Sequence, residues 1–349
     1  MIVSIFGTPS ALTAWIAHVA RIIVDAAAGP HIYVPAITLE DLRTALAERN
    51  GRAVVLYSDI PKSCLVDLVL GSRIPYLVAA DDPMNVVGYV AAARKLSLKD
   101  SLRFTSQSLS ILARMRFGAR ALYLDGSAYA QSVDAFMAAI IEHFGINLAP
   151  NKFDDLCARL MGDKINKNPT IIDLVLRDLP HALPPGGFAE RYTADQQLII
   201  NDTISSYGGL MVMPQSQTIT WRPEVVPDRD NLERILDGPR DMLGPARILF
   251  GGHTLHLPVG AWKAKVILEI AENYSGNQLI SQVYCGSDLL RFVNAKLPVD
   301  GVFGYEMEFE VADSFSPIQV LIGIGEGAIE GKLYLRLITF DRQPTSAAV

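Results

Sequence analysis

Short apolar runs alternate with segments of helical spacing along the first 145 residues. Five runs have the composition of buried strands, at 2–6, 31–34, 53–57, 74–79 and 121–125. Between them, apolar residues recur every three or four positions, as on the buried face of a helix, in 11–22, 39–46, 64–70, 84–93, 99–116 and 133–144. This alternation predicts a parallel sheet covered by helices, with ligand sites at the carboxyl ends of the strands.

A different pattern begins at Pro245, where apolar and polar residues alternate. The alternation is clearest in Trp262–Glu269 and Tyr305–Val311, and it is typical of antiparallel strands with one buried and one solvated face. Strands are predicted at 247–250, 254–257, 261–270, 278–285, 289–293, 305–311, 318–323 and 332–340. Many short strands separated by turns predict an antiparallel β-sandwich, like a jelly roll.

The two patterns predict two domains, because 349 residues exceed the usual size of a single core. We expect an α/β domain over residues 1–210, whose last helix is Thr193–Tyr207. Residues 211–244 are rich in proline and charge, and they predict a linker with one short helix at 231–236. The sandwich domain is expected over residues 245–342.

Composition acts mainly by excluding classes of partner. A net charge of −6 and a pI near 5.6 provide no basic field, so neither nucleic acid nor an anionic membrane is expected to bind. Cys64, Cys157 and Cys285 are scattered, as are the histidines, so no metal site is expected. No export signal or apolar run of ~18 residues is evident, which predicts a cytoplasmic protein without a membrane span. Homo-oligomerisation is left open.

The first strand and the first helix are joined by a tight turn, Gly7 to Ser10. A strand, a glycine turn and a helix N-terminus in succession direct unpaired backbone N–H groups and the positive end of the helix dipole at the turn. An anion such as phosphate could bind there. No lysine follows Gly7 in the turn, so the nucleotide-binding lysine loop is absent.

The segment Gly7–Trp15, GTPSALTAW, resembles the 5′-phosphosulfate loop of sulfotransferases, G-x-P-[RK]-S-G-T-[ST]-[WL]. The resemblance implies a P-loop fold and the donor phosphoadenosine phosphosulfate (PAPS). It implies that the donor is held by Gly7, Thr8, Pro9, Ser10 and Thr13. Ser10 replaces the basic residue of the family, and the serine and glycine that follow it there are alanine and leucine here.

A second segment, Pro75–Tyr89, resembles the strand and R-D-P-[RW]-D-V-x-x-S motif that holds the 3′-phosphate in the same family. The resemblance places Asp81 and Asn85 in this part of the site, and Gly88 or Tyr89 where the family has its closing serine. The family's arginine attracts the 3′-phosphate of the donor, whereas aspartate at this position repels it, and each close charge pair is worth roughly 4 kcal/mol. The segment therefore still predicts the fold of the family, but it predicts weaker binding of the donor.

In the sandwich, residues 256–264 resemble a strand turn of carbohydrate-binding sandwiches. Sugar recognition requires exposed aromatic rings and planar polar side chains. Trp262, Tyr274 and Tyr284 are therefore candidate carbohydrate-binding residues. Aromatic residues of the core, or of a docking surface, would give the same sequence pattern.

Three functions fit these observations. The first is sulfonate transfer from PAPS to a glycan or another small acceptor, for which no motif assigns a catalytic residue, although Lys62, His18, His31 and Asp59 offer a cation and bases. The second is an inactive relative on the same scaffold. The third is a non-enzymatic carbohydrate-binding or interaction protein. A closed or acid-lined turn at Gly7 would favour the second, and an exposed aromatic platform on the sandwich the third.

Overall fold

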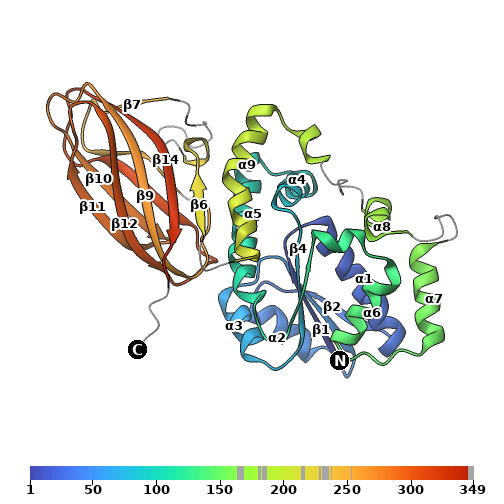
Figure 1. Ribbon diagram of the computed structural model, residues 1–349. Helices are drawn as coiled ribbons and strands as arrows, with labels where there is room; N and C mark the ends of the chain where they lie inside the picture. The colour runs from blue at the N-terminus through green and yellow to red at the C-terminus, as the bar shows by residue number, and fades with distance from the viewer. Residues whose placement is uncertain are drawn as a thin grey trace. The chain divides into compact units, whose positions relative to one another are not determined.

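The computed structural model describes residues 1–162, 169–179, 182, 187–213, 217–227, 229, 236, 238–252 and 254–344. The chain forms two compact units, which divide between Tyr192 and Thr193 (Figure 1). We call them the α/β unit (Met1–Tyr192) and the sandwich unit (Thr193–Val349).

The α/β unit is built on a five-stranded parallel sheet in the order β2-β3-β1-β4-β5. The strands are β1 Ile2–Gly7, β2 His31–Pro35, β3 Ala53–Ser58, β4 Tyr76–Ala80 and β5 Ala121–Asp125. The register pairs Phe6 of β1 with Ser58 of β3, and Gly7 with Ala79 of β4. Because the strands are parallel, the residues that follow β1, β3, β4 and β5 gather at one edge of the sheet.

Helices cover both faces of this sheet, as the alternating pattern predicts (Figure 1). They are α1 Ala11–Ala28, α2 Leu39–Ala47, α3 Ser63–Gly71, α4 Pro83–Arg94, α5 Leu98–Met115, α6 Val133–His143, α7 Pro150–Met161 and α8 Ile171–Asp178, with 3₁₀ turns η1 Gly126–Ala130 and η2 Gly187–Arg191. The spacing of apolar residues on α1 buries Leu12, Trp15, Ile16 and Ile23 completely.

Among the described residues, α1 is also the one helix long and apolar enough to cross a membrane by length and composition alone. Its mean hydropathy is 1.4, although Arg21 and Asp25 interrupt it. The helix packs in the main hydrophobic core, where Trp15 contacts the ring of Phe136 on α6. A core helix of a globular domain meets the same criterion.

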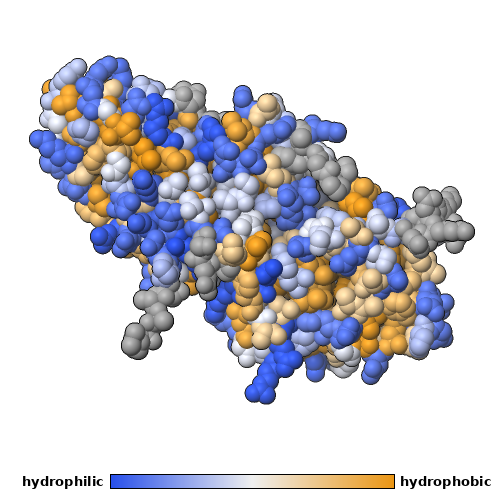
Figure 2. Space-filling view, viewed as in Figure 1, coloured by the Kyte–Doolittle hydropathy of each residue, from blue (hydrophilic) through white to orange (hydrophobic). Residues whose placement is uncertain are grey.

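The sandwich unit has two antiparallel sheets. The first, β11-β10-β13-β8, is called the four-stranded sheet, and the second, β12-β9-β14-β6, is called the charged sheet for reasons given below. The strands are β6 Thr218–Trp221, β7 Arg240–Asp241, β8 Arg247–Phe250, β9 Gly260–Ala271, β10 Gln278–Cys285, β11 Asp288–Lys296, β12 Gly301–Val311, β13 Ile318–Ile324 and β14 Lys332–Arg342. Hydrophobic and hydrophilic residues are intermixed on the visible face of this unit (Figure 2).

The structure corrects the predicted boundaries. The sequence assigns Thr193–Tyr207 to the first domain, but helix α9, Ala194–Gly208, belongs to the sandwich unit. It is tied there by Tyr207, whose hydroxyl donates to the His256 carbonyl (2.8 Å) and accepts from Trp221 Nε1 (3.2 Å). Trp221 lies on β6, inside the predicted linker, and β6 pairs with β14. Most of the helix predicted at 231–236 lies outside the described residues.

One predicted strand is absent. Residues 254–257 form no strand, although the backbone of Thr254 and Leu255 exchanges hydrogen bonds with Ile318. A longer strand could not extend past Leu257, because Pro258 has no N–H to donate.

Candidate functional site

The turn after β1 is closed by its own side chains. Ser10 caps α1, because its Oγ accepts from the Thr13 N–H at 3.2 Å and lies 3.2 Å from Thr13 Oγ1. The Thr8 N–H donates to the Ala79 carbonyl at 2.9 Å. Thr8, Ser10 and Thr13 are almost completely buried. Two backbone N–H groups that could face an anion therefore already have partners inside the protein.

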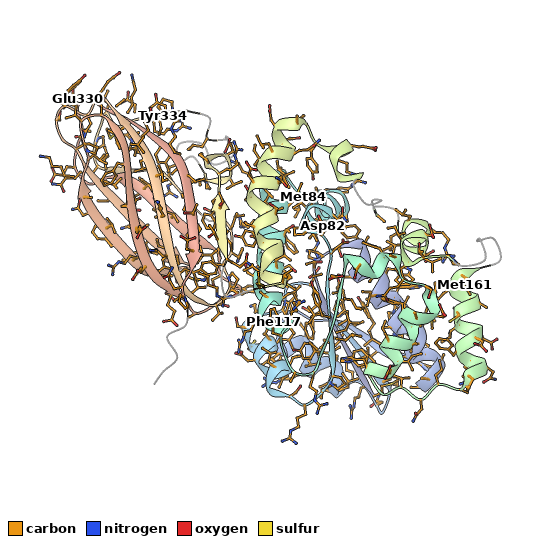
Figure 3. All side chains as sticks on the ribbon, viewed as in Figure 1. Asp82, Met84, Phe117, Met161, Glu330 and Tyr334 are labelled. Atoms are coloured by element: carbon orange, nitrogen blue, oxygen red, sulfur yellow. The ribbon has the colours of Figure 1, made fainter. Side chains whose placement is uncertain are left out.

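Asp81 lies against this turn, one residue beyond the end of β4. Its backbone N–H donates to Thr8 Oγ1 at 3.1 Å, which fixes it to the turn. One carboxylate oxygen, Oδ1, accepts from the Asp82 N–H at 2.8 Å and from Asn85 Nδ2 at 3.3 Å. Asp82 and Met84 mark this point at the start of α4 (Figure 3).

The second carboxylate oxygen of Asp81 is held by Tyr129, a residue of η1. The Tyr129 hydroxyl donates to Asp81 Oδ2 at 2.6 Å. The backbone of Leu12, in the first turn of α1, acts on the same hydroxyl, because it lowers the pKa of Tyr129 against the effect of burial. Tyr129 thus lies near both the end of β4 and the N-terminus of α1.

Burial governs the ionisation of both partners. Desolvation raises the pKa of the Asp81 carboxyl above its ordinary value, against the opposing effect of the hydrogen bonds from Tyr129 and Asn85. Burial also raises the pKa of the Tyr129 hydroxyl, and the nearby Asp81 carboxylate raises it further. The phenol therefore stays protonated and acts as the donor of the pair.

This raised pKa predicts a pH dependence of stability that Asp81→Asn removes. A carboxyl with a pKa higher in the folded than in the unfolded state favours folding below the unfolded value of 3.8, and that contribution is lost as the pH rises through the folded value. Stability of the wild type relative to Asp81→Asn should therefore fall as the pH rises from 4. Asp82, Asn85 and Tyr129 face this carboxyl. Urea unfolding across pH 4–8 measures the difference, and a difference that is constant or grows with pH would refute the prediction.

The residues present do not fit PAPS. Asp59 and Asp81 follow the two strands that flank β1, so the turn has a carboxylate on each side and no base at Ser10. A donor phosphate at this turn would face the carboxylate of Asp81, whose backbone is tied to Thr8 and whose side chain is tied to Tyr129. Arg191 approaches this region, but its Nη1 lies 3.5 Å from the Gly88 carbonyl on α4 rather than at the turn.

The other proposed catalytic groups have partners or positions of their own. Asp59, beside the turn, is largely buried, which raises its pKa, and it forms an ion pair with Arg94. Lys62 is the N-cap residue of α3. His31 lies at the opposite, amino-terminal edge of the sheet and bonds Asp25 at 2.5 Å, and His18 is exposed on α1.

The three candidate carbohydrate-binding residues of the sandwich unit differ in their exposure to solvent. Trp262 is fully buried and donates from Nε1 to the Pro258 carbonyl at 2.8 Å, so it is a core residue and the prediction that it binds carbohydrate is wrong. Tyr274 is 69% exposed, in the turn after β9. Tyr284 lies on the outward face of β10, since Leu279, Ser281 and Val283 of the same strand are buried on the inward side.

The register of the four-stranded sheet places Tyr284 in a grid of outward side chains, which we call the amide–aromatic face. Directly opposed residues share a face, and three rows cross the strands β11, β10 and β13. The rows are Leu289–Tyr284–Gln319, Phe292–Gln282–Leu321 and Asn294–Ile280–Gly323. Neighbouring columns lie ~4.8 Å apart and rows ~7 Å apart, so the face extends over ~14 Å along the strands.

The amide–aromatic face is open to solvent, and its three rows contain no charged residue. Phe292 is 48% and Leu289 51% exposed, and Tyr284, Gln282 and Gln319 are partly exposed. The next pair along β10 and β11, Gln278 with Lys296, adds one exposed lysine beyond the third row. Such a face combines rings with planar amides, as sugar recognition requires.

The outward face of the charged sheet has the opposite character. Its register opposes Glu306 to Lys265 and Glu308 to Lys263, and Lys263 also faces Asp341 on β14. Lys263 and Glu306 form an ion pair at 3.3 Å. A polar cavity of about 520 Å³ lies beside β14 in this unit, where Arg222 holds both Asp202 and Glu224.

Within the described residues, no group of three or more histidines, cysteines or acidic residues could hold a metal ion. Sequence reasoning missed Tyr129, Phe292 and Gln319. Phe292 and Gln319 could have been found from strand alternation once the register was known, whereas nothing in the sequence around Tyr129 indicates a partner 48 residues away.

Comparison with known proteins finds likeness to solved structures over separate parts of the chain. No protein-family model and no curated protein matches the sequence. A mouse sulfotransferase complexed with PAP is 12% identical, with 56% of this chain and 80% of that chain covered and a TM-score of 0.36. Retinol dehydratase in a complex with retinol and PAP is 13% identical, with 61% and 81% covered and a TM-score of 0.38.

A third solved structure resembles the C-terminal part of the chain. It is the C-terminal family 6 carbohydrate-binding module of a laminarinase from the marine organism Zobellia galactanivorans, 13% identical, with 36% of this chain and 100% of that chain covered and a TM-score of 0.24. The chain thus has sulfotransferase-like structural neighbours over its N-terminal part and carbohydrate-binding modules over its C-terminal part. At these identities the likeness concerns the fold alone.

Proposed function

We propose that this protein is a non-enzymatic glycan-binding protein, in which the amide–aromatic face of the sandwich unit holds an uncharged sugar chain. The observation that carries the proposal is the placement of Tyr284, Phe292, Gln282 and Gln319 on one solvent-facing grid. In this reading the α/β unit is a scaffold related in fold to sulfotransferases that does not use their donor.

The chemistry of the face favours a glycan over a protein partner. Rings of Tyr284 and Phe292 offer apolar surfaces of the size of a sugar ring, and the amides of Gln282 and Asn294 can donate to and accept from its hydroxyls. The ~14 Å length of the face fits an oligosaccharide better than a single sugar. The three rows of the grid carry no charge to pair with sulfate or uronate groups, and Lys296 adds one positive charge beside the third row.

The alternative, transfer of a sulfonate from PAPS to a glycan, requires a cation at the transferring group and a base at the acceptor. Ser10 supplies no charge, and the nearest acidic residue, Asp81, is engaged by Tyr129. The enzyme reading therefore ranks second. A cytoplasmic location and the oligomeric state stay predictions.

Replacing the two rings tests the proposal. Tyr284→Ala/Phe292→Ala should weaken binding at least ~10-fold, since loss of stacked aromatic contacts costs about 0.5–1.5 kcal/mol per pair beyond area burial. Affinity electrophoresis against neutral glucans, galactans, xylans and mannans, with heparin as the charged comparison, measures this. Retained migration shifts in the double variant would refute the site.

Two tyrosines serve as matched controls. Tyr274 is exposed in a turn off the grid, and Tyr334 lies on the charged sheet, near the same end of β14 as Glu330 (Figure 3). Tyr274→Ala and Tyr334→Ala should bind like the wild type. A larger loss in either control than in the double variant would move the site to that residue, and binding of heparin alone would overturn the uncharged ligand.

A further inference from the structure

The contacts of Tyr129 supply what an anion would supply at this turn. An anion at a helix N-terminus accepts hydrogen bonds from backbone N–H groups of the first turn. Here the Tyr129 hydroxyl donates to Asp81 Oδ2 at 2.6 Å, and the Leu12 backbone in the first turn of α1 lowers the pKa of the same hydroxyl against the effect of burial. A hydroxyl oxygen of the protein therefore lies near the helix N-terminus, with the Asp81 carboxylate behind it.

The surrounding contacts make the pair part of the framework. Asp81 is anchored through its backbone to Thr8, and through Oδ1 to Asp82 and Asn85. The Thr13 side chain fills the space over Gly7, where a donor phosphate would approach the backbone. The backbone N–H groups of Thr8 and Thr13 and both carboxylate oxygens of Asp81 therefore have partners within the protein.

We infer that the Tyr129–Asp81 pair is an internal ligand, which occupies the place of an oxoanion at the N-terminus of α1 and excludes the sulfonate donor. The contacts of the pair are made within the protein itself. The conformation of the turn depends on two side chains that arrive from the ends of β4 and β5 rather than on a nucleotide.

A double-mutant cycle tests the pairing. Tyr129→Phe and Asp81→Asn should each raise the unfolding equilibrium constant of the α/β unit by roughly 10-fold, with a coupling of roughly 3- to 100-fold between them. Asn85→Ala, which removes only the 3.3 Å contact to Asp81, is the control and should have a clearly smaller effect. Additive effects of Tyr129→Phe and Asp81→Asn would overturn the inference.

Ligand titration tests the exclusion. Calorimetry of the wild-type protein with PAP should show no saturable heat at millimolar concentration, and saturable binding that Tyr129→Phe leaves unchanged would overturn the inference. Tyr129→Ala/Asp81→Ser opens the place of the pair. Inorganic sulfate, compared with chloride at equal ionic strength, should raise the unfolding midpoint of this variant more than that of Asn85→Ala. If both variants fold and sulfate raises their unfolding midpoints equally, the inference is also overturned. The titration of the wild-type protein with PAP tests the inference even if Tyr129→Ala/Asp81→Ser does not fold.

Discussion

Gly7→Ala lowers the free energy of unfolding of the α/β unit by about 3 kcal/mol, the upper range for overpacking a filled interior. A Cβ at Gly7 would clash with Thr13 Cγ2 and lie 2.6 Å from Thr13 Oγ1 and 2.8 Å from the Ala79 carbonyl. That carbonyl is part of the sheet and accepts from Thr8, so it cannot move aside. Hydrogen exchange, read separately on peptides of the two units, measures the loss.

Gly71→Ala is the matched control for Gly7→Ala. Gly71 ends α3 in the same unit, and no atom lies within 4 Å of the place of its Cβ. Alanine there should leave stability unchanged or raise it slightly, because it reduces the entropy of the unfolded chain. If Gly7→Ala is no more destabilising than Gly71→Ala, the turn is open in solution and the closed geometry described above is wrong.

Tyr207→Ala destabilises the sandwich unit by about 3–5 kcal/mol, as expected when a fully buried aromatic residue is truncated. The variant also loses the hydrogen bonds to the His256 carbonyl and from Trp221 Nε1. Tyr207→Phe keeps the ring and should cost about 1–3 kcal/mol, since both polar partners stay buried.

Hydrogen exchange of Tyr207→Ala shows which unit is destabilised, and so to which unit α9 belongs. If α9 belongs to the sandwich unit, amide protection should fall in β6, β9 and β14, and peptides of 1–162 should exchange as in the wild type. Loss of protection confined to 1–162 would return α9 to the first domain, where the sequence places it.

Most helices and strands can be predicted from the sequence, because buried apolar residues recur along each element with the period of that element. The α/β strands are continuous apolar runs, and the turn at Gly7–Ser10 is found where the structure has it. The predicted domain boundary at residue 210 differs from the division between Tyr192 and Thr193. The apolar spacing of α9 shows that one face of this helix is buried, but it does not show which unit covers that face. The strand β6 reads Thr-Ile-Thr-Trp, an alternation too short to separate from a linker.

The candidate sites depend on contacts between distant residues, and the sequence predicts these less well. Trp262 could have been placed in the core, since Ala264, Val266 and Leu268 share its parity on β9. Tyr284 was identifiable as an aromatic residue on a strand, but its neighbours Phe292 and Gln319 follow only from the register. The partnership of Asp81 with Tyr129 depends on how β5 is followed by η1.

The two broad faces of the sandwich differ in charge, and this difference affects how copies of the protein would contact one another on a polysaccharide surface. If the amide–aromatic face lies against an insoluble polysaccharide, the ladder of Glu306 and Glu308 with their lysine partners is turned toward the solution. Like-patterned, ionised surfaces resist dehydration and close contact with one another. Further copies of the protein would then not bind to copies already on the polysaccharide, so the protein would cover the polysaccharide as a single layer.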